Sequence, residues 1–304
     1  MAEAEAAPDW IALDWGTTHL RGWAMAADGR VLAQATSDQG MGRLTRDGYE
    51  AALLALAGDW LARPITAIAC GMVGSRQGWV EAPYASVPCA ALPEGLALAP
   101  TVTPGLRVLV IPGIRQDRPA DVMRGEETQI AGFLALNPGW DGVLCLPGTH
   151  TKWAQVSAGE VVSFQTCMTG DMFAALSTQT VLRHTVGAEG WDDAAFGTAL
   201  TDAIARPEKL AARLFSLRAE HLLHGLGPDT ARARLSGLLI GAELAATRPY
   251  WLGQQIAVIG AGFVSGVYVK ALAAQSATAV QADGTAVTLA GLTAAWHRLR
   301  EQET

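Results

Sequence analysis

Apolar and polar positions alternate near the start of the chain in the way that β-strands require. From residue 11 to residue 38, three extended runs are separated by a Gly-Thr-Thr turn and by an Asp28-Gly29 turn. An Asp-Gly pair between two such runs is a strong hairpin signal, because both residues tolerate positive φ. The pattern predicts three antiparallel strands with a tight polar turn after the first.

A second stretch, residues 143 to 166, repeats this pattern. An apolar run leads into a Gly-Thr turn, a further extended run follows, and a small turn at Ala158-Gly159 precedes the last run. The repetition predicts an internally duplicated protein whose two halves face each other across a cleft. When the hairpins are superposed, Gly16 and Thr17 correspond to Gly148 and Thr149, Arg21 lies near Lys152, and Trp23 lies near Trp153.

The residues around the first turn suit a phosphate group. Gly16 lets a phosphate approach the backbone, and the hydroxyls of Thr17 and Thr18 can donate hydrogen bonds to it. Asp14 can hold Mg²⁺ through water. An ordinary polar hairpin could carry the same residues, but the second copy at Gly148 favours phosphate binding.

Helices and strands alternate through the rest of the chain. Asn137-Pro138-Gly139 interrupts this pattern, so we predict domains at 1–138 and 139–304, each with a mixed sheet and helices packed on it. Strands are expected near 65–70, 107–114, 255–259 and 277–280, with a polar connection from Asp117 to Asp121. Helices are expected near 46–62, 123–136, 171–184, 190–225 with breaks at Pro207 and Gly225, 229–247, 262–272 and 284–302. The helices of 190–225 are expected to form a helical insertion in the second domain.

Composition narrows the class of protein. Of the 304 residues, 50% are hydrophobic and 17% are charged, which is typical of a globular protein. The net charge of −7 argues against nucleic-acid partners and against an anionic membrane surface. Without an apolar run of about 18 residues or a signal-like start, a cytoplasmic location is expected. The four cysteines form no C-x-x-C pair and are interpreted as reduced, buried thiols.

A glycine-rich polar loop follows the strand expected near residues 65–70. Gly74, Ser75, Arg76 and Trp79 lie in it. Open α/β sheets place ligand contacts at the ends of parallel strands, so Arg76 and Trp79 become substrate candidates. Arg76 could bind a carboxylate with two parallel hydrogen bonds. As an isolated surface pair, the two side chains would simply be solvated.

Three further segments hold candidate chemistry with a structural alternative beside each. Glu126 and Glu127 open a predicted helix, where they suit the helix dipole or could supply a general base. Asp171 is either a helix N-cap or a second candidate base. Residues 260–262 could begin a dinucleotide fingerprint, which is weak alone, or form a loop of small residues against a nucleoside. His221 and His224 have no third ligand nearby, so a metal site is not expected there.

Seven segments, in one order along the chain, resemble the 2-dehydro-3-deoxygalactonokinase family of the sugar kinase, hsp70 and actin superfamily. They are DWGTTHLRGW (14–23), GMVGSRQGWVEAPY (71–84), IPG (111–113), MRGEETQIAG (123–132), PGTHTKW (147–153), MTGD (168–171) and LSGLLIGAE (235–243). The resemblance implies two ribonuclease H-like domains facing an interdomain cleft. It also implies an enzyme that uses ATP and Mg²⁺ to phosphorylate the 6-hydroxyl of 2-dehydro-3-deoxy-D-galactonate.

The same resemblance suggests roles for individual residues. Related phosphatases carry a similar S-G-x-E-E segment with a catalytic glutamate, so Glu127 is favoured as the base, followed by Glu126 and Asp171. The expected substrate contacts are Arg21, Gly74, Ser75, Arg76, Trp79 and Arg124. The expected nucleotide and phosphate contacts are Asp14, which also holds the metal, Gly16, Thr17, Thr18, Gly148, Thr149, His150, Lys152, Gly260, Ala261 and Gly262.

Other functions remain open at this level. A phosphatase of the same fold would use a similar glutamate to activate water, and a kinase of another sugar acid, such as 2-dehydro-3-deoxygluconate, would need the same residues. A regulator of this superfamily would normally carry a helix-turn-helix segment, which the residues before the first strand do not predict. The expected partner is a small-molecule sugar acid, and a homodimer is compatible with the sequence.

Overall fold

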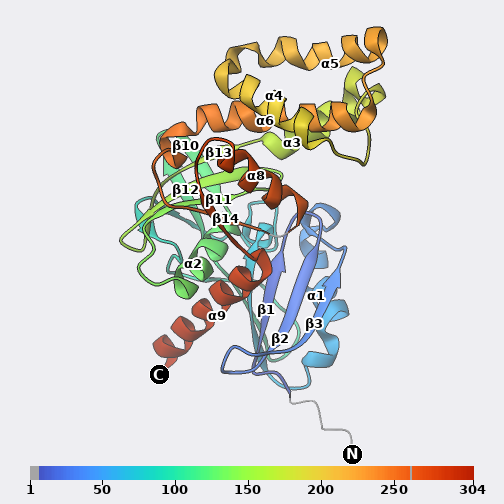
Figure 1. Cartoon of the computed structure of the whole chain (residues 1–304). Helices are drawn as coiled ribbons and strands as arrows, with labels where there is room; N and C mark the ends of the chain where they lie inside the picture. Colours follow the sequence, from blue (N-terminus) through green and yellow to red (C-terminus); the bar gives the residue numbers. More distant parts are fainter. Residues whose placement is uncertain (1–6, 261) are drawn as a thin grey trace, which may run out of the picture. The chain divides into compact units, whose positions relative to one another are not determined.

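The computed structural model describes residues 7–260 and 262–304, which fold into two compact α/β units (Figure 1). Unit 1 contains the described residues up to Trp140 together with Ser157–Ser163 and Gly284–Thr304. Unit 2 contains Asp141–Val156 and Phe164–Asp283. The fold class expected from the sequence is confirmed by these units and by the solved structures described below. None of the helices in the described part of the chain combines the length and the apolar character that a membrane crossing requires.

The main sheet of unit 1 is built on the first predicted hairpin. Its strands lie in the order β3-β2-β1-β4-β8-β7. The first three are antiparallel neighbours, whereas β4 and β8 run parallel to β1. Gly29 has φ +87°, as the predicted Asp-Gly turn requires. The strands are β1 (Trp10–Trp15), β2 (Leu20–Met25), β3 (Val31–Ser37), β4 (Ile65–Gly71), β7 (Ala97–Leu98) and β8 (Leu106–Val110).

A small second sheet in unit 1 was not predicted. Its three strands lie in the order β10-β9-β5, with bounds Tyr84–Ser86 for β5, Gly113–Asp117 for β9 and Ala120–Met123 for β10. Polar residues dominate the β9–β10 hairpin, and for that reason the sequence suggested only a polar connection there. A two-residue strand, β6 (Cys89–Ala90), pairs with the start of β13 (Glu160–Cys167).

Three helices pack in unit 1. They are α1 (Tyr49–Ala57), α2 (Glu126–Leu136) and α9 (Gly284–Glu303). Leu53 and the ring of Tyr49 are buried against β1, so the predicted helical face of residues 46–62 does enter the core. The helix itself is shorter than predicted, with single 3₁₀ turns at either end.

Helix α9 corrects the predicted domain organisation. It was expected to complete the second half, within the range 139–304, but it belongs to unit 1, where it packs on α2, β1 and β4 (Figure 1). The physical reason is a close helix–helix contact: a Cβ on Gly291 would lie 2.0 Å from the carbonyl oxygen of Thr128. The ring of Trp296 also stacks on Trp10, with centroids 5.3 Å apart. The first crossing between units follows Trp140, close to the predicted boundary at residue 138.

Unit 2 repeats the strand arrangement of unit 1. Strand β11 pairs antiparallel with β12 and parallel with β14, which pairs parallel with β15. Ala158 and Gly159 both have positive φ, as expected for the turn between β12 and β13. The strand bounds are Gly142–Leu146 for β11, Thr151–Ser157 for β12, Ile256–Ile259 for β14 and Ala279–Ala282 for β15.

The helices of unit 2 include the predicted helical insertion. Helices α4, α5 and α6 form a layer that runs from yellow to orange in Figure 1, and α5 ends at Gly225 in the left-handed conformation. Cβ atoms on Gly237 or Gly241 would clash with carbonyl oxygens of α4, so these glycines allow α6 to pack closely on α4. The helices are α3 (Thr169–Gln179), α4 (Asp193–Ala205), α5 (Leu210–His224), α6 (Pro228–Ala246), α7 (Arg248–Trp251) and α8 (Phe263–Ala273).

Candidate active site

The turn after β1 is held through its backbone and leaves its hydroxyls exposed. The amide of Gly16 donates to the carbonyl of His19 at 3.0 Å, and Met41 N–H donates to the Gly16 carbonyl at 3.0 Å. Thr17 and Thr18 are both exposed. The turn is therefore fixed in place, with two hydroxyl groups available to a ligand, as the phosphate prediction requires.

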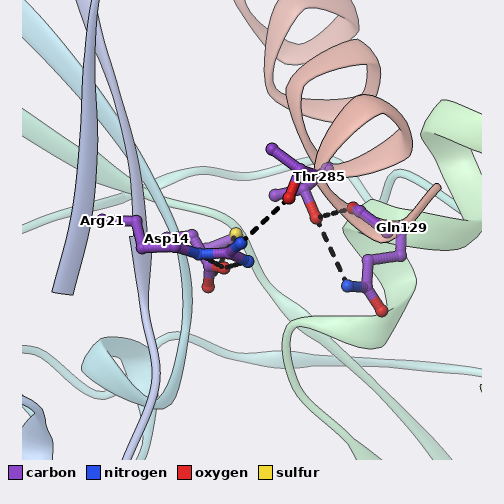
Figure 2. Close-up of polar contacts among 7 residues, drawn as sticks. Asp14, Arg21, Gln129 and Thr285 are labelled. Atoms are coloured by element: carbon purple, nitrogen blue, oxygen red, sulfur yellow. Dashed lines mark hydrogen bonds and ion pairs between the residues drawn. The ribbon is translucent and has the colours of Figure 1, made fainter. Parts of the chain in front are cut away.

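Asp14 and Arg21 form an ion pair across the first hairpin (Figure 2). Arg21 Nε donates to Asp14 Oδ2 at 3.1 Å, and Arg21 Nη1 donates to the hydroxyl of Thr285 on α9 at 3.1 Å. Cys70 Sγ lies 3.9 Å from the other carboxylate oxygen of Asp14. The predicted metal ligand is thus partnered by the predicted substrate contact.

Mg²⁺ fits this site only if most of its ligands are water molecules and substrate phosphates. In the part of the chain that the structure describes, no three His, Cys, Asp or Glu side chains are grouped to hold a metal. Mg²⁺ commonly binds one or two carboxylates and completes its shell with water and substrate phosphates. Asp14, with about a fifth of its side chain exposed, could supply one such carboxylate.

Glu127 is fully buried at the first turn of α2. Its two carboxylate oxygens accept hydrogen bonds from Gly125 N–H at 2.6 Å and from the Thr128 hydroxyl at 3.0 Å. Burial, and then the negative charge of Glu126, raise the pKa of Glu127 to about 7. Glu126 is half-buried, and its carboxylate accepts the N–H of Arg124 at 3.0 Å.

The thiol of Cys70 lies near the carboxylates of both Asp14 and Glu127. Burial raises the pKa of the Cys70 thiol strongly, and the nearby charges of Asp14 and Glu127 raise it further. The thiol therefore lies within electrostatic reach of both carboxylates. The structure brings the predicted metal ligand and the predicted base together in unit 1.

Arg124 is a buried cation without a buried anion. Only 8% of its surface is exposed, and Nη2 donates to the carbonyl of Ala82 at 2.8 Å. Its guanidinium stacks on the ring of Tyr84 at 4.3 Å, while Nε and Nη1 have no hydrogen-bond partner among the described residues. Gly74 makes room for it, because a Cβ there would lie 2.8 Å from Nη1.

The other substrate candidates in the 71–84 loop differ in how far their side chains are exposed to solvent. Arg76 is exposed, and Ser75 is buried with Oγ 3.2 Å from the sulfur of Met41. Trp79 is a core residue: it stacks on Tyr49, and its indole N–H donates to the Pro100 carbonyl at 3.0 Å. The prediction that Trp79 contacts substrate is therefore corrected, because its ring is already fully packed. Three tryptophans near the motifs are likewise buried, namely Trp15, Trp23 and Trp153.

The second phosphate turn, in unit 2, is supported by the start of α3. The amide of Asp171 donates to the Thr149 carbonyl at 3.0 Å, and a Cβ on Gly170 would lie 2.3 Å from the Gly148 carbonyl oxygen. His150 Nε2 lies 3.3 Å from the Asp171 carboxylate, and both side chains are about half exposed. Asp171 is inside the first turn of α3, whose N-cap is Met168, so the N-cap alternative is wrong.

A cavity of about 500 Å³ opens beside this turn in unit 2. The side chains of Trp191 and Phe263 meet edge to face with centroids 4.7 Å apart, and Arg232 stacks on Phe173 at 5.0 Å. The volume lies in the range of small-molecule sites, which are typically apolar with a few polar groups. The cavity is lined by Pro147, Gly148, Thr149, Thr169, Gly170, Phe173, Ala174, Trp191, Arg232, Ser236, Leu239, Ile240, Gly260, Phe263, Val264, Ser265 and Tyr268.

The predicted nucleoside loop borders this cavity. Gly260 has φ +142°, which side chains rarely allow, and a Cβ at this position would lie 2.4 Å from the Ser265 hydroxyl. The position therefore requires glycine. Gly262 caps α8 with φ +80°. Ala261 lies outside the described residues. Lys152, predicted to contact phosphate, is buried on β12.

Sequence reasoning missed residues that reach the site from distant segments. Arg21 and Thr285 are 264 positions apart, and no local spacing could have joined them. Trp191 precedes α4 and Arg232 lies on α6, and neither residue belongs to one of the family-like segments. Tyr84 ends the family-like segment 71–84, but its stacking on Arg124, forty residues further along the chain, has no local sequence signal.

Known proteins resemble this chain over nearly its full length. The profile of the family described as 2-keto-3-deoxy-galactonokinase matches residues 14–295. A probable 2-dehydro-3-deoxygalactonokinase of Rhizobium meliloti is 40% identical over 94% of this chain and 96% of its own. The 2-dehydro-3-deoxygalactonokinase of Escherichia coli is 36% identical over 91% of this chain and 92% of its own.

Solved structures share the fold of this chain. A crystal structure from Sinorhizobium meliloti, assigned as a 2-dehydro-3-deoxygalactonokinase protein, has a TM-score of 0.89 and 35% identity over 95% of this chain and 99% of its own. The activator of 2-hydroxyisocaproyl-CoA dehydratase from Clostridium difficile shares the fold alone, with a TM-score of 0.54 and 12% identity over 97% of this chain and 96% of its own. The family profile and the curated relatives together show that this chain belongs to the 2-keto-3-deoxy-galactonokinase family.

Proposed function

We propose that the protein transfers the γ-phosphoryl group of ATP to the 6-hydroxyl of 2-dehydro-3-deoxy-D-galactonate. The products are the 6-phosphate and ADP, and the reaction is a step of galactonate catabolism. The identity of the sugar acid comes from the names of the family and its relatives. The observation in this molecule that carries the proposal is the buried, unpaired guanidinium of Arg124.

Arg124 suits an acidic substrate for an electrostatic reason. A buried cation with two unpartnered nitrogens costs free energy until an anion binds it. A carboxylate binds a guanidinium through strong, charge-assisted hydrogen bonds, and Nη1 and Nε of Arg124 each have N–H groups left to donate. A neutral sugar would leave this cation unpaired, so unit 1 is built to prefer a sugar acid.

Unit 2 suits the nucleotide. We propose that the nucleoside occupies the 500 Å³ cavity, with its base against Phe263 and Trp191 and its ribose near Gly260. The phosphates then lie toward Gly148 and Thr149 and toward the start of α3. The dipole of α3 favours an anion at that helix end. Thr17 and Thr18 of the first turn are proposed as further phosphate contacts.

Glu127 is proposed to accept the proton of the attacking hydroxyl. A pKa of about 7 places the carboxyl near the value at which a base works best at neutral pH. Because Glu127 is fully buried, the acceptor hydroxyl has to reach it when the sugar acid binds. Glu126, which is half-buried beside it, is the second candidate, and Asp171 of unit 2 is the third.

Mg²⁺ would be held by the nucleotide phosphates and by Asp14, directly or through water. When bound, it neutralises charge on the phosphate oxygens during transfer. Arg21 keeps the Asp14 carboxylate in position through its ion pair. Positioning and charge neutralisation would supply most of the rate enhancement.

An ADP-release assay tests the proposed function. Purified protein with Mg²⁺ and ATP would be supplied with 2-dehydro-3-deoxygalactonate, 2-dehydro-3-deoxygluconate, galactonate, gluconate or no sugar. We expect turnover with 2-dehydro-3-deoxygalactonate and little with galactonate, with gluconate or without sugar. Phosphate release without any sugar would instead identify a phosphatase, and no turnover with any acid despite ATP binding would refute the kinase assignment.

Two coarser expectations accompany this function. A catabolic kinase draws on the cytoplasmic ATP pool, so we propose a cytoplasmic location, which cell fractionation can check. We also propose a homodimer, to be measured by light scattering at micromolar concentration.

A further inference from the structure

A buried carboxylate in unit 2 has no role in the reaction described above. Glu243 lies on α6, ends the family-like segment 235–243, and is only 5% exposed. No ion pair involving it is found in the described residues, so its charge is balanced by hydrogen bonds alone. Burial raises the pKa of Glu243, while three donors oppose that shift.

The three donors come from three different elements. Trp153 Nε1 on β12 donates to Glu243 Oε1 at 2.8 Å, and Tyr268 Oη on α8 donates to Oε2 at 2.9 Å. The hydroxyl of Thr169, the first residue of α3, also donates to Oε2. One side chain of α6 therefore links β12, α3 and α8.

A fourth residue extends this network. Tyr268 Oη lies 2.9 Å from the hydroxyl of Thr151 on β12. Because the single proton of Tyr268 is directed to Glu243, the Thr151 hydroxyl must donate to Tyr268. All hydroxyl protons of the network therefore point toward the Glu243 carboxylate, which fixes the direction of each hydrogen bond.

The elements that Glu243 joins are the ones that surround the cavity. Thr169 and Tyr268 line it directly, and Trp153 follows the second phosphate turn on β12. Thr169 is also next to Gly170, whose contact with Gly148 supports that turn. A shift at any of the three elements would change the shape of the cavity or the direction of the helix N–H groups.

We propose that Glu243 is the positioning residue of the nucleotide site, holding α3, β12 and α8 in the arrangement that grips the nucleotide. This inference rests on the proposed function, which places the nucleotide in the cavity of unit 2. A buried carboxylate is an expensive way to fill a helix interface, since apolar residues of similar volume often stabilise a protein more. Its value here is that one ionised group accepts from three donors, which neither an apolar residue nor a single amide oxygen can do.

The variant Glu243→Gln keeps the shape and removes the charge. The amide can no longer accept from all three donors, because one of its two terminal atoms is itself a donor. We expect the Kd for ADP, measured by calorimetry, to rise about tenfold, which is the size of one charge-assisted hydrogen bond. The KM for ATP should rise similarly, while the KM for the sugar acid stays unchanged.

Leu244→Ala is the matched control. Leu244 is the next residue of α6, is fully buried, and belongs to the apolar core of unit 2 without joining the network. Its truncation should lower the melting temperature at least as much as Glu243→Gln does but leave the Kd for ADP within about twofold of wild type. A purely structural role for Glu243 predicts instead that affinity follows the melting temperature in both variants.

A double-mutant cycle with Thr169→Val completes the test. Valine removes the donor at nearly constant shape, so Thr169→Val should weaken ADP binding, Thr169→Ser should restore it, and the pair Thr169→Val with Glu243→Gln should cost less than the sum. Additive losses, or unchanged ADP affinity in Glu243→Gln, would overturn the inference. If Glu243→Gln does not fold, Thr169→Val and Trp153→Phe each remove one donor and carry the same comparison. Failure of the wild type to bind ADP is a distinct result, and it would overturn the nucleotide assignment as well.

Discussion

Individual charges in unit 1 differ in how they are balanced. Asp14 and Arg21 neutralise each other across a hairpin, with Thr285 as a further partner (Figure 2). Arg124 contacts a backbone carbonyl and an aromatic face but has no ion-pair partner among the described residues. Glu127 is buried with only neutral donors. Burying Arg124 and Glu127 without an oppositely charged partner costs free energy, which a bound substrate can offset. Substitutions at these two residues should therefore lower activity without lowering stability to the same extent.

Replacing Arg124 should weaken sugar-acid binding without lowering the stability of the protein. Arg124→Met removes a buried, unpaired cation, so we expect the melting temperature to stay level or to rise. The same change should raise the KM for the sugar acid by about 100-fold, because the carboxylate loses its charged hydrogen-bond donor. Arg76→Met, at an exposed arginine of the same loop, is the control and should change the KM less than threefold. Equal effects at both positions would contradict the assignment.

Replacing Glu127 should remove the chemical step and spare binding. Glu127→Gln should lower kcat by roughly 10²–10⁴-fold while the KM for ATP stays within a factor of about two. In the wild type, activity should increase as the pH rises through about 7, since a base acts only after it has lost its proton. Glu126→Gln distinguishes the two carboxylates: a larger loss of kcat in that variant would transfer the base role to Glu126.

Glu127 should also make the stability of the protein depend on pH. Its pKa is 4.5 in the unfolded chain and about 7 in the folded one, so between these values only the folded state retains the proton. The free energy of unfolding therefore falls as the pH rises through this range, by on the order of 3 kcal/mol from this group. Urea unfolding at about pH 5 and about pH 8 should show this decrease, and Glu127→Gln should abolish that part of it. An unchanged pH dependence in the variant would show that Glu127 titrates normally.

At the scale of elements, the start of α3 and the second phosphate turn form one packed contact. Gly170 lies so close to Gly148 that no side chain fits between them. The amide of Asp171 then bonds the Thr149 carbonyl. The turn therefore takes its position from a helix rather than from its own sequence.

Gly170→Ala should disturb this contact specifically. The new methyl group would lie 2.3 Å from the Gly148 carbonyl oxygen, and backbone atoms can relieve that overlap only by moving the turn. We expect the Kd for ADP to rise at least about tenfold, which calorimetry can measure. Gly197→Ala, in open space on α4, is the control and should stabilise the protein by up to about 1 kcal/mol without changing ADP binding. Unchanged ADP affinity in Gly170→Ala would refute the role of this contact.

Sequence patterns predicted elements better than the contacts between them. Both hairpins carry strong local signals, such as Asp28-Gly29, and the helical insertion ends at Gly225 as predicted. Trp79 was misjudged because a tryptophan in a polar loop looks exposed, whereas long-range packing on Tyr49 buries it. The unpaired state of Arg124 and the network around Glu243 depend on elements far apart in the chain, so no spacing rule could reveal them.

At the scale of the whole molecule, each unit has its own apolar core. Trp296 of α9 stacks on Trp10 in unit 1, and Trp251 of α7 is buried in the core of unit 2. Neither residue touches the proposed ligands. They therefore allow one unit to be weakened at a time while the two binding functions are followed separately.

Truncating these two tryptophans should affect different ligands first. Trp296→Ala should lower the free energy of unfolding by about 3–5 kcal/mol, and in mild urea sugar-acid binding should be lost before ADP binding. Trp251→Ala, the matched control, should show the reverse order. Fluorescence titrations at increasing urea concentration can follow both ligands. Loss of ADP binding first in Trp296→Ala would show that α9 supports unit 2 instead.

The assignment of residues 284–304 to unit 1 has a consequence for synthesis on the ribosome. Nascent domains generally fold in order as they emerge, the N-terminal one first. Here the first 140 residues must wait for residues 284–304 before the Trp10–Trp296 stack can form. The residues of unit 2 emerge in the meantime, interrupted only by Ser157–Ser163. The part of the protein that is made first is therefore expected to be completed last, and until then the face of Trp10 that Trp296 covers stays exposed.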